Sequence, residues 1–231
     1  MTEKLETLTI NDVEIRWLGH AGFRIAWPGG TLYVDPYKVR VSPRDGRLVL
    51  VTHEHFDHCS PEDILRVASS GATLVAPRVA ESCAAKTGLK VVSVAPGDKL
   101  ELGDVVIETV PAYNTNKFRA PGVVFHPKED GRVGYLIEVG GVRIFHAGDS
   151  DNIPEYEQLR GRVDVALLPV SGVYVMTAEE AAEAAKRIQP RVAIPMHYGE
   201  FVGSEADAEK LARLLEGSGV KVVILERTTR L

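Results

Sequence analysis

The spacing of apolar residues along the chain predicts alternating groups of strands and helices. From Leu8 to Trp17, and again from Phe23 to Trp27, apolar residues recur at nearly every second position, which predicts half-buried strands joined by turns. Further strands are predicted at residues 31–34, 48–51, 73–76, 91–94, 105–110, 133–139, 142–145, 163–170, 192–195 and 220–225. Helices are predicted at residues 61–69, 78–87, 177–189 and 204–216. Each half of the chain therefore contains strands and then helices, which indicates an α/β sandwich built twice.

Helix-capping residues stand where two of these helices are expected to begin. Ser60 precedes Pro61 and is followed three residues later by Asp63, and Thr177 is followed three residues later by Glu180. A hydroxyl at the cap and a carboxylate three residues on can satisfy free N–H groups of the first turn, and proline suits the first helical position. The residues between 113 and 130 show no such order, and a loop of this length is usually functional or disordered.

Composition and charge limit the class of protein. The chain has 231 residues, of which 45% are hydrophobic, and we expect one domain over residues 1–231. Its net charge of −5 gives no support for binding nucleic acid. No apolar run approaches the ~18–20 residues of a membrane span, and the N-terminal residues do not resemble a signal peptide. We expect no disulfide framework from Cys59 and Cys83, with Cys59 packed as a small apolar group, and a cytoplasmic location.

The segment that follows the predicted strand 48–51 carries a dense set of metal-binding side chains. His53, His55, Asp57 and His58 lie within six positions, although the whole chain has only seven histidines. Residues two apart in an extended segment point to the same side, so His53 and His55 can bind one cation. Asp57 and His58 can then bind a second. Imidazole and carboxylate ligands suit zinc, and also manganese or iron, so we expect one or two divalent cations with zinc preferred.

Three more polar residues follow predicted strands, at Asp35, Asp149 and His197. Strand ends at one edge of an α/β sheet meet in space, so these residues are expected near the histidine-rich segment. Asp149 would bridge the two cations, and His197 would complete the second metal site. Asp35 would hydrogen-bond a ligand histidine from behind. His20 also follows a strand, and we expect it to face the metals without binding them.

The chain resembles the metallo-β-lactamase fold superfamily over roughly residues 13 to 225. Its signature H-x-H-x-D-H is present here as residues 53–58. Four further segments resemble the branch that includes ascorbate-6-phosphate lactonase, namely Trp17-Leu18-Gly19-His20, Val34-Asp35-Pro36, His146-Ala147-Gly148-Asp149 and Ile194-Pro195-Met196-His197. The resemblance implies a four-layer αβ/βα sandwich with the metals at one edge, and a metal-dependent hydrolase as the activity.

One position departs from the superfamily pattern. The first metal usually has a third histidine after the strand that is expected here at 105–110, but this chain has Asn114. An amide is a poorer zinc ligand than imidazole. Three interpretations follow: Asn114 binds weakly, His126 from the long loop takes the place, or only the second site binds metal tightly. We favour His126.

These residues predict a hydrolytic mechanism. Two cations bridged by Asp149 would bind a water and lower its pKa, and Asp57 would orient the hydroxide that forms. This metal-bound hydroxide would attack the carbonyl of an ester or lactone, or the phosphorus of a phosphoester. Asp57 and Asp149 are therefore the predicted catalytic residues.

The predicted partner is a small, anionic molecule. Lys117, Arg119 and Lys128 are basic residues in the long loop of an otherwise acidic chain. The residues expected to line the pocket are Ser171, Tyr174 and Tyr198. We expect no nucleic acid and no membrane as partners, and the sequence leaves room for a homo-oligomer.

Two other classes of protein share parts of this pattern. A non-catalytic or regulatory metal-binding protein with a degenerate first site is the main alternative, because Asn114 replaces a histidine. A redox di-iron protein of the same fold is disfavoured, since that type needs a carboxylate in place of His55 and usually an attached flavin domain.

Overall fold

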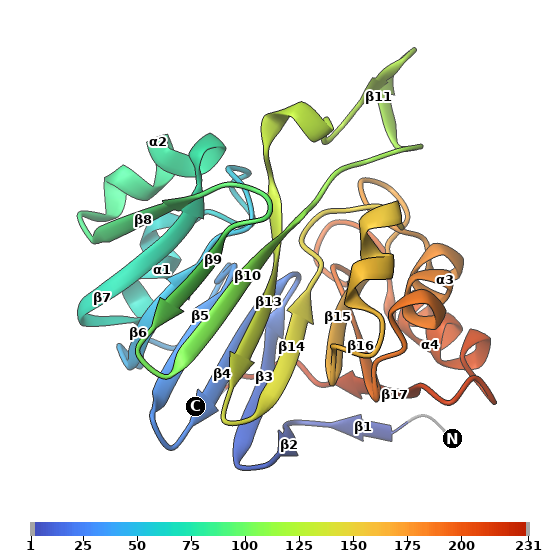
Figure 1. Cartoon of the computed structure of the whole chain (residues 1–231), viewed down its shortest axis with the longest axis horizontal. Coiled ribbons are helices and arrows are strands. Elements are labelled where there is room, and N and C mark those ends of the chain that lie inside the picture. The colour runs from blue at the N-terminus through green and yellow to red at the C-terminus, as the bar shows by residue number, and fades with distance from the viewer. Residues whose placement is uncertain (1–2, 230–231) are drawn as a thin grey trace.

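The computed structural model describes residues 3–229, and its first large sheet has seven strands (Figure 1). In spatial order these are β2 (Leu8–Ile10), β3 (Val13–Gly19), β4 (Gly22–Trp27), β5 (Gly30–Val34), β6 (Gly46–Leu50), β7 (Ala68–Pro77) and β8 (Lys90–Val94). Strands β2 to β5 pair antiparallel, and β5 to β8 pair parallel. The carboxyl ends of β5 and β6 therefore lie at one edge of this sheet.

The second large sheet has eight strands and faces the first. In spatial order these are β1 (Glu3–Leu5), β17 (Lys221–Leu225), β16 (Val192–Met196), β15 (Val165–Pro169), β14 (Val142–His146), β13 (Val133–Val139), β10 (Val105–Pro111) and β9 (Lys99–Leu102). Strands β14, β15 and β16 pair parallel, so their carboxyl ends also meet at one edge. A small hairpin of β11 (Phe118–Ala120) and β12 (Val123–Val124) projects from the top of Figure 1.

Helices cover the outer face of each sheet, which completes four layers (Figure 1). The first sheet is covered by α1 (Pro61–Val67) and α2 (Glu81–Ala84), and the second by α3 (Ala178–Ile188) and α4 (Glu205–Leu214). Short 3-10 turns lie at η1 (Arg78–Ala80), η2 (Ala85–Thr87), η3 (Lys128–Asp130) and η4 (Pro154–Leu159). The predicted αβ/βα sandwich is confirmed.

Burial of alternating side chains holds the two sheets together. The main core contains Ile15 and Phe23 of the first sheet and Ile107 and Ile137 of the second, none of which is exposed to solvent. Tyr135 adds a polar link, because its hydroxyl donates to the carbonyl oxygen of residue 51 across the interface at 2.6 Å. The removal of these apolar side chains from water is the main favourable contribution to the stability of the fold. The packed sheets in turn fix the strand ends that carry the site.

The predicted starts of α1 and α3 are confirmed. Ser60 caps α1, and Thr177 and Glu180 form a capping box at α3. The carboxylate of Asp63 accepts from the backbone N–H groups of Lys38 and Val39, at 2.9 Å each, so it also fixes the loop that follows β5.

Several element boundaries differ from the prediction. Helix α1 ends at Val67 instead of residue 69, because the chain turns at once into β7 to pair with β6. The helix predicted at 78–87 is split into η1, α2 and η2. Strands β1, β9, β11 and β12 were not predicted, since each has only two to four residues, too few to establish a pattern. Within residues 3–229, no helix is both long and apolar enough to cross a membrane.

The prediction that the two cysteines form no disulfide was wrong. Cys59 is bonded to Cys83 of α2, so the histidine-rich segment is joined covalently to a helix on the outer face of the first sheet. The sequence did not show this contact because 24 positions separate the two residues. Because His58 directly precedes Cys59, the disulfide anchors the chain next to a residue of the candidate metal centre.

Replacing both cysteines, as Cys59→Ala/Cys83→Ala, should lower the free energy of unfolding by about 3–4 kcal/mol, because the unfolded chain regains the freedom of the closed loop. Denaturant unfolding with and without dithiothreitol measures this. The reductant should destabilise the wild type by a similar amount and leave the double variant unchanged. A wild type that is insensitive to reductant, with no loss of two mass units on oxidation, would show that the bond does not form.

Candidate metal centre

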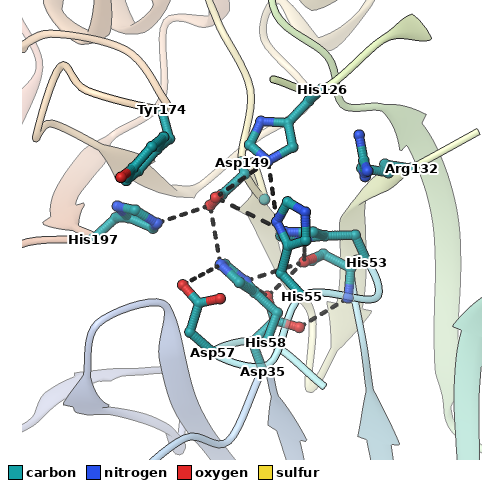
Figure 2. Close-up of polar contacts among 12 residues, drawn as sticks. Asp35, His53, His55, Asp57, His58, His126, Arg132, Asp149, Tyr174 and His197 are labelled. Carbon is teal, nitrogen blue, oxygen red and sulfur yellow. Dashed lines mark hydrogen bonds and ion pairs between the residues drawn. The ribbon is translucent and has the colours of Figure 1, made fainter. Parts of the chain in front are cut away.

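The metal-binding side chains come from strand ends of both sheets. Asp35 follows β5, and His53, His55, Asp57 and His58 follow β6. From the second sheet, Asp149 follows β14 and His197 follows β16, while His126 lies between β12 and β13. Figure 2 shows Asp149 in the middle of the cluster, with His197 on one side and His53, His58 and His126 on the others. The structure thus brings together all the residues that were predicted to bind metal, except Asn114.

Three imidazoles and one carboxylate oxygen form the first group of ligand atoms. His53 Nε2 lies 3.0 Å from His55 Nδ1, which lies 3.4 Å from His126 Nε2. Asp149 Oδ2 lies 3.9 Å from His53 Nε2 and 3.8 Å from His126 Nε2. These are the donors expected for the first metal.

The other oxygen of Asp149 belongs to the second group. Asp149 Oδ1 lies 3.2 Å from both His58 Nε2 and His197 Nε2. Asp57 Oδ2 lies 3.5 Å from His58 Nε2. Asp149 therefore presents one oxygen to each group, as a bridging carboxylate would.

The spacing and bonding of these atoms fit divalent cations. Ligands bound tetrahedrally at zinc distances lie about 3.4 Å from one another, close to the separations in both groups. His58 Nε2, His197 Nε2 and Asp149 Oδ1 are also buried without a hydrogen-bond partner. Buried polar atoms left in this way are costly unless another group satisfies them. A cation between them would accept all three lone pairs.

Hydrogen bonds behind the imidazoles fix which nitrogen faces the centre. Asp35 Oδ2 lies 2.7 Å from His58 Nδ1 and accepts from the Thr52 hydroxyl at 2.6 Å. The same hydroxyl lies 3.0 Å from His53 Nδ1. These contacts place the proton of each ring on Nδ1 and leave the Nε2 lone pair free for a metal.

Two further contacts orient the second group. Ser171 Oγ lies 3.1 Å from His197 Nδ1, and His20 Nε2 lies 2.8 Å from Asp57 Oδ2. His20 is fully buried and packs its ring against His197, and a ring nitrogen lies within 4.8 Å of ligand atoms of Asp57, His58 and His197, close enough to join them around one ion. The expectation that His20 faces the metals without binding them stays a prediction. His20, Asp35 and His197 all have positive φ angles, a strained conformation that is concentrated at functional sites.

Burial and neighbouring charges prepare the side chains for metal binding. Burial lowers the pKa of His126 to about 4 and the pKa of His53 well below its usual value, so both rings are neutral near pH 7. Burial opposes a charge on His58 too, but the surrounding carboxylates outweigh it and raise the pKa of His58 well above its usual value. Likewise, His197 and His58 outweigh the burial of Asp149 and hold its pKa well below the usual range. The centre therefore favours a positive charge between ionised carboxylates.

The structure places His126, and not Asn114, at the third position of the first group. The amide of Asn114 turns away from the centre: its nitrogen donates to the carbonyl oxygen of Tyr174 at 2.9 Å. Its oxygen accepts from the backbone N–H of His126 at 3.0 Å. Asn114 thus holds the long loop in the position that brings the His126 ring to His55.

The residues predicted to bind substrate lie away from the centre. The Lys117 ammonium is buried against Glu180 at 2.7 Å and Asp151 at 3.3 Å, and Arg119 lies on the exposed hairpin strand β11. Tyr198 stacks on Trp17, with ring centroids 4.8 Å apart, and lines a different pocket. The structure does not bring these three residues together with the metal ligands.

Sequence reasoning missed the supporting roles of three residues, although one of them, Ser171, was expected to line the pocket. Thr52 and Ser171 contact imidazoles of the candidate centre. Arg132, which Figure 2 shows at the edge of the cluster, is 6% exposed and forms an ion pair with Glu54. Thr52 and Glu54 flank His53 in the sequence, which was the available signal. Nothing in the sequence ties Arg132 to the centre or shows that Ser171 contacts His197.

Two facing sheets with outer helices, and a histidine and carboxylate cluster at their shared edge, define the class of metallo-β-lactamase folds. The sequence profile of the beta-lactamase superfamily domain matches residues 14–197, and the chain belongs to this superfamily.

Named relatives cover nearly the whole chain. It is 36% identical to a UPF0173 protein of Pyrococcus furiosus, over 92% of this chain and 95% of that protein. It is also 36% identical to a UPF0173 metal-dependent hydrolase of Methanopyrus kandleri, over 93% of this chain and 97% of that protein. A crystal structure from Parabacteroides distasonis has a TM-score of 0.80 and 30% identity, covering 94% of this chain and 96% of that one. The narrower resemblance to ascorbate-6-phosphate lactonase stays a prediction.

The variant His126→Ala should lose one equivalent of bound metal, because the first group then keeps only two imidazoles. Asn114→Ala should keep both equivalents, with weaker binding at the first site, since it loosens the loop without removing a ligand. Elemental analysis of zinc-loaded proteins measures the content. Loss of an equivalent in Asn114→Ala alone would assign the ligand to Asn114.

The variant Asp35→Asn should weaken metal binding about 10- to 100-fold, because the ring of His58 loses the carboxylate that orients it. Competition with a chromophoric chelator measures the affinity. Asp12→Asn, in the exposed turn between β2 and β3, is the matched control and should bind as the wild type does. Equal affinity of both variants would contradict the role given to Asp35.

Proposed function

We propose that this chain is a metal-dependent hydrolase that cleaves a carboxylic ester, a lactone or a phosphoester. One observation carries the proposal: Asp149 directs its two oxygens to two separate groups of ligand atoms. Both groups lie beside an opening to solvent that His55, Asp57, His126 and Asp149 help to line. The relative from Methanopyrus kandleri, which is named a metal-dependent hydrolase, supports it.

The residues of the candidate centre would have separate roles in hydrolysis. Divalent cations bound there, with zinc preferred and manganese or iron as alternatives, would acidify a water and polarise the oxygen that gains charge. Asp57 reaches the same opening, where its carboxylate can orient that water and accept a proton from it. His20 donates to Asp57 Oδ2 and so fixes the direction in which this carboxylate points. Burial lowers the pKa of His20 to about 4, which keeps its ring neutral while it does so.

The site geometry argues against the main alternative. A regulatory protein with a degenerate first metal site was suggested by Asn114 alone. His126 supplies an imidazole in that place, at 3.4 Å from His55 Nδ1, so a full set of ligands is present without Asn114. The reason for expecting a degenerate site is therefore removed.

An anionic substrate has less support than the hydrolytic reaction. It was suggested by the basic residues of the loop at 113–130. Lys117 is paired with Glu180, and Lys128 is paired with Glu155 at 2.7 Å, so neither has a free charge beside the centre. The anionic substrate stays a prediction.

Chelation should abolish hydrolysis, and added zinc or manganese should restore it. Probes for the three bond types are p-nitrophenyl acetate, a γ-lactone and bis(p-nitrophenyl) phosphate. The variant Asp149→Asn should lose at least about 100-fold in kcat/KM, because it removes the carboxylate shared by both groups. Asp12→Asn serves again as the control and should keep full activity. Metal-loaded wild type that turns over none of these probes would favour the regulatory alternative.

A further inference from the structure

An opening of about 310 Å³ lies directly over the metal-binding side chains. It is lined by His55, Phe56, Asp57, Phe125, His126, Asp149, Tyr174 and Phe201. Pockets for small ligands in proteins span about 300–1,000 Å³, so this one suits a compact molecule. Four of its lining residues belong to the candidate metal centre, and the other four are aromatic. We call these four, Phe56, Phe125, Tyr174 and Phe201, the aromatic opening.

The four aromatic side chains come from four separate loops. Phe56 lies between metal ligands after β6, and Phe201 follows β16; their ring centroids are 6.0 Å apart. Phe125 precedes His126, and Tyr174 follows β15; their rings meet edge to face with centroids 4.8 Å apart. Figure 2 shows Tyr174 on the side of the cluster where His197 lies. Two aromatic pairs thus flank one entrance to the centre.

Two of these rings are exposed to an unusual degree. Phe56 is 67% exposed and Phe201 is 47% exposed. Large apolar groups gathered at the surface of a protein often mark a site of interaction. Here they surround a pocket with the candidate metal ligands at its base, so a small molecule bound in this pocket would contact them.

No lysine or arginine lines this opening within the part of the chain that the structure describes. Arg132, the basic residue close to His55, is buried and paired with both Glu54 and Asp130. An anionic group on a substrate would find only metal ions as positive partners here. A flat apolar group would instead gain contact with the aromatic faces.

One wall of the opening, formed by Phe125 and Tyr174, is held in place before any ligand binds. Asn114 donates to the carbonyl oxygen of Tyr174 and accepts from the backbone N–H of His126, so one side chain ties together both loops of one wall. A pocket that is already formed loses little conformational freedom on binding. Its shape can therefore select among substrates.

We propose that the aromatic opening selects substrates with an uncharged aromatic or similarly flat apolar group beside the bond that is cleaved. This inference rests on the proposed hydrolase function, and it names the substrate class of the same site. Phe56 and Phe201 are the residues that determine the preference. Burying one phenyl ring between aromatic side chains is enough for a selectivity of about tenfold or more.

Three methyl esters with the same leaving group provide the first test: methyl phenylacetate, methyl acetate and monomethyl succinate. Acid release by the zinc-loaded protein is followed in a pH-stat. We expect kcat/KM for methyl phenylacetate to exceed both others by about tenfold or more. A preference for monomethyl succinate would overturn the inference and leave the hydrolase function intact.

Substitutions assign the preference to residues. Phe56→Ala and Phe201→Ala should each lower the ratio of kcat/KM for methyl phenylacetate over methyl acetate, mainly through KM. Phe118→Ala is the matched control, because Phe118 is 53% exposed but lies on β11, outside the opening. An unchanged ratio in the double variant Phe56→Ala/Phe201→Ala would contradict the assignment.

Binding without turnover separates the two proposals. The affinities of phenylacetamide, which is neutral and aromatic, and of succinamate, which is anionic, are measured by calorimetry on the zinc-loaded protein. We expect phenylacetamide to bind more tightly, and the double variant to weaken it about tenfold while Phe118→Ala does not. If this holds but no ester, lactone or phosphoester is cleaved, the aromatic selectivity stands and the hydrolase function fails. If succinamate binds more tightly, the aromatic selectivity fails.

Discussion

The shared carboxylate of Asp149 sets the main constraint on this structure. It is only 4% exposed, and its two oxygens face imidazoles from both sheets and from the long loop. A buried carboxylate is costly unless positive groups or metal ions oppose it, so strand ends from the two sheets must meet at this point. The preceding Gly148 makes the approach possible: its φ is +62°, and a Cβ there would lie 3.0 Å from the carbonyl oxygen of Val133. A larger residue at position 148 would displace the Asp149 carboxylate, so that its two oxygens no longer face both groups of ligand atoms.

Local patterns predicted the fold and most of the centre. The strands that precede the ligands are short apolar runs with clear ends, and His53 and His55 could be paired because residues two apart in an extended segment point to the same side. Asp149 and His197 could be added because parallel strands end at a common edge. His126 was favoured over Asn114 from its place on the long loop, which is where the structure puts a third imidazole.

Long-range partners could not be predicted in this way. Lys117 was interpreted as a free cation because nothing in the sequence shows that Glu180, 63 positions away, packs against it. The disulfide between Cys59 and Cys83 could not be predicted for the same reason, since it depends on how α2 lies against the first sheet. The aromatic opening is assembled from four loops and has no periodicity. Such features are decided by tertiary packing, and local propensity says little about them.

The order of two neighbouring residues in the long loop has a wider consequence. Phe125 lines the opening over the candidate metal centre, and His126, the next residue, brings its imidazole to the first group of ligand atoms. Because the two residues are consecutive and Asn114 fixes the backbone at His126, the position of the Phe125 ring and the position of the His126 ring are set together. A change in the length or path of this loop would therefore alter both the ligand geometry and the shape of the opening, so the two cannot diverge independently during evolution.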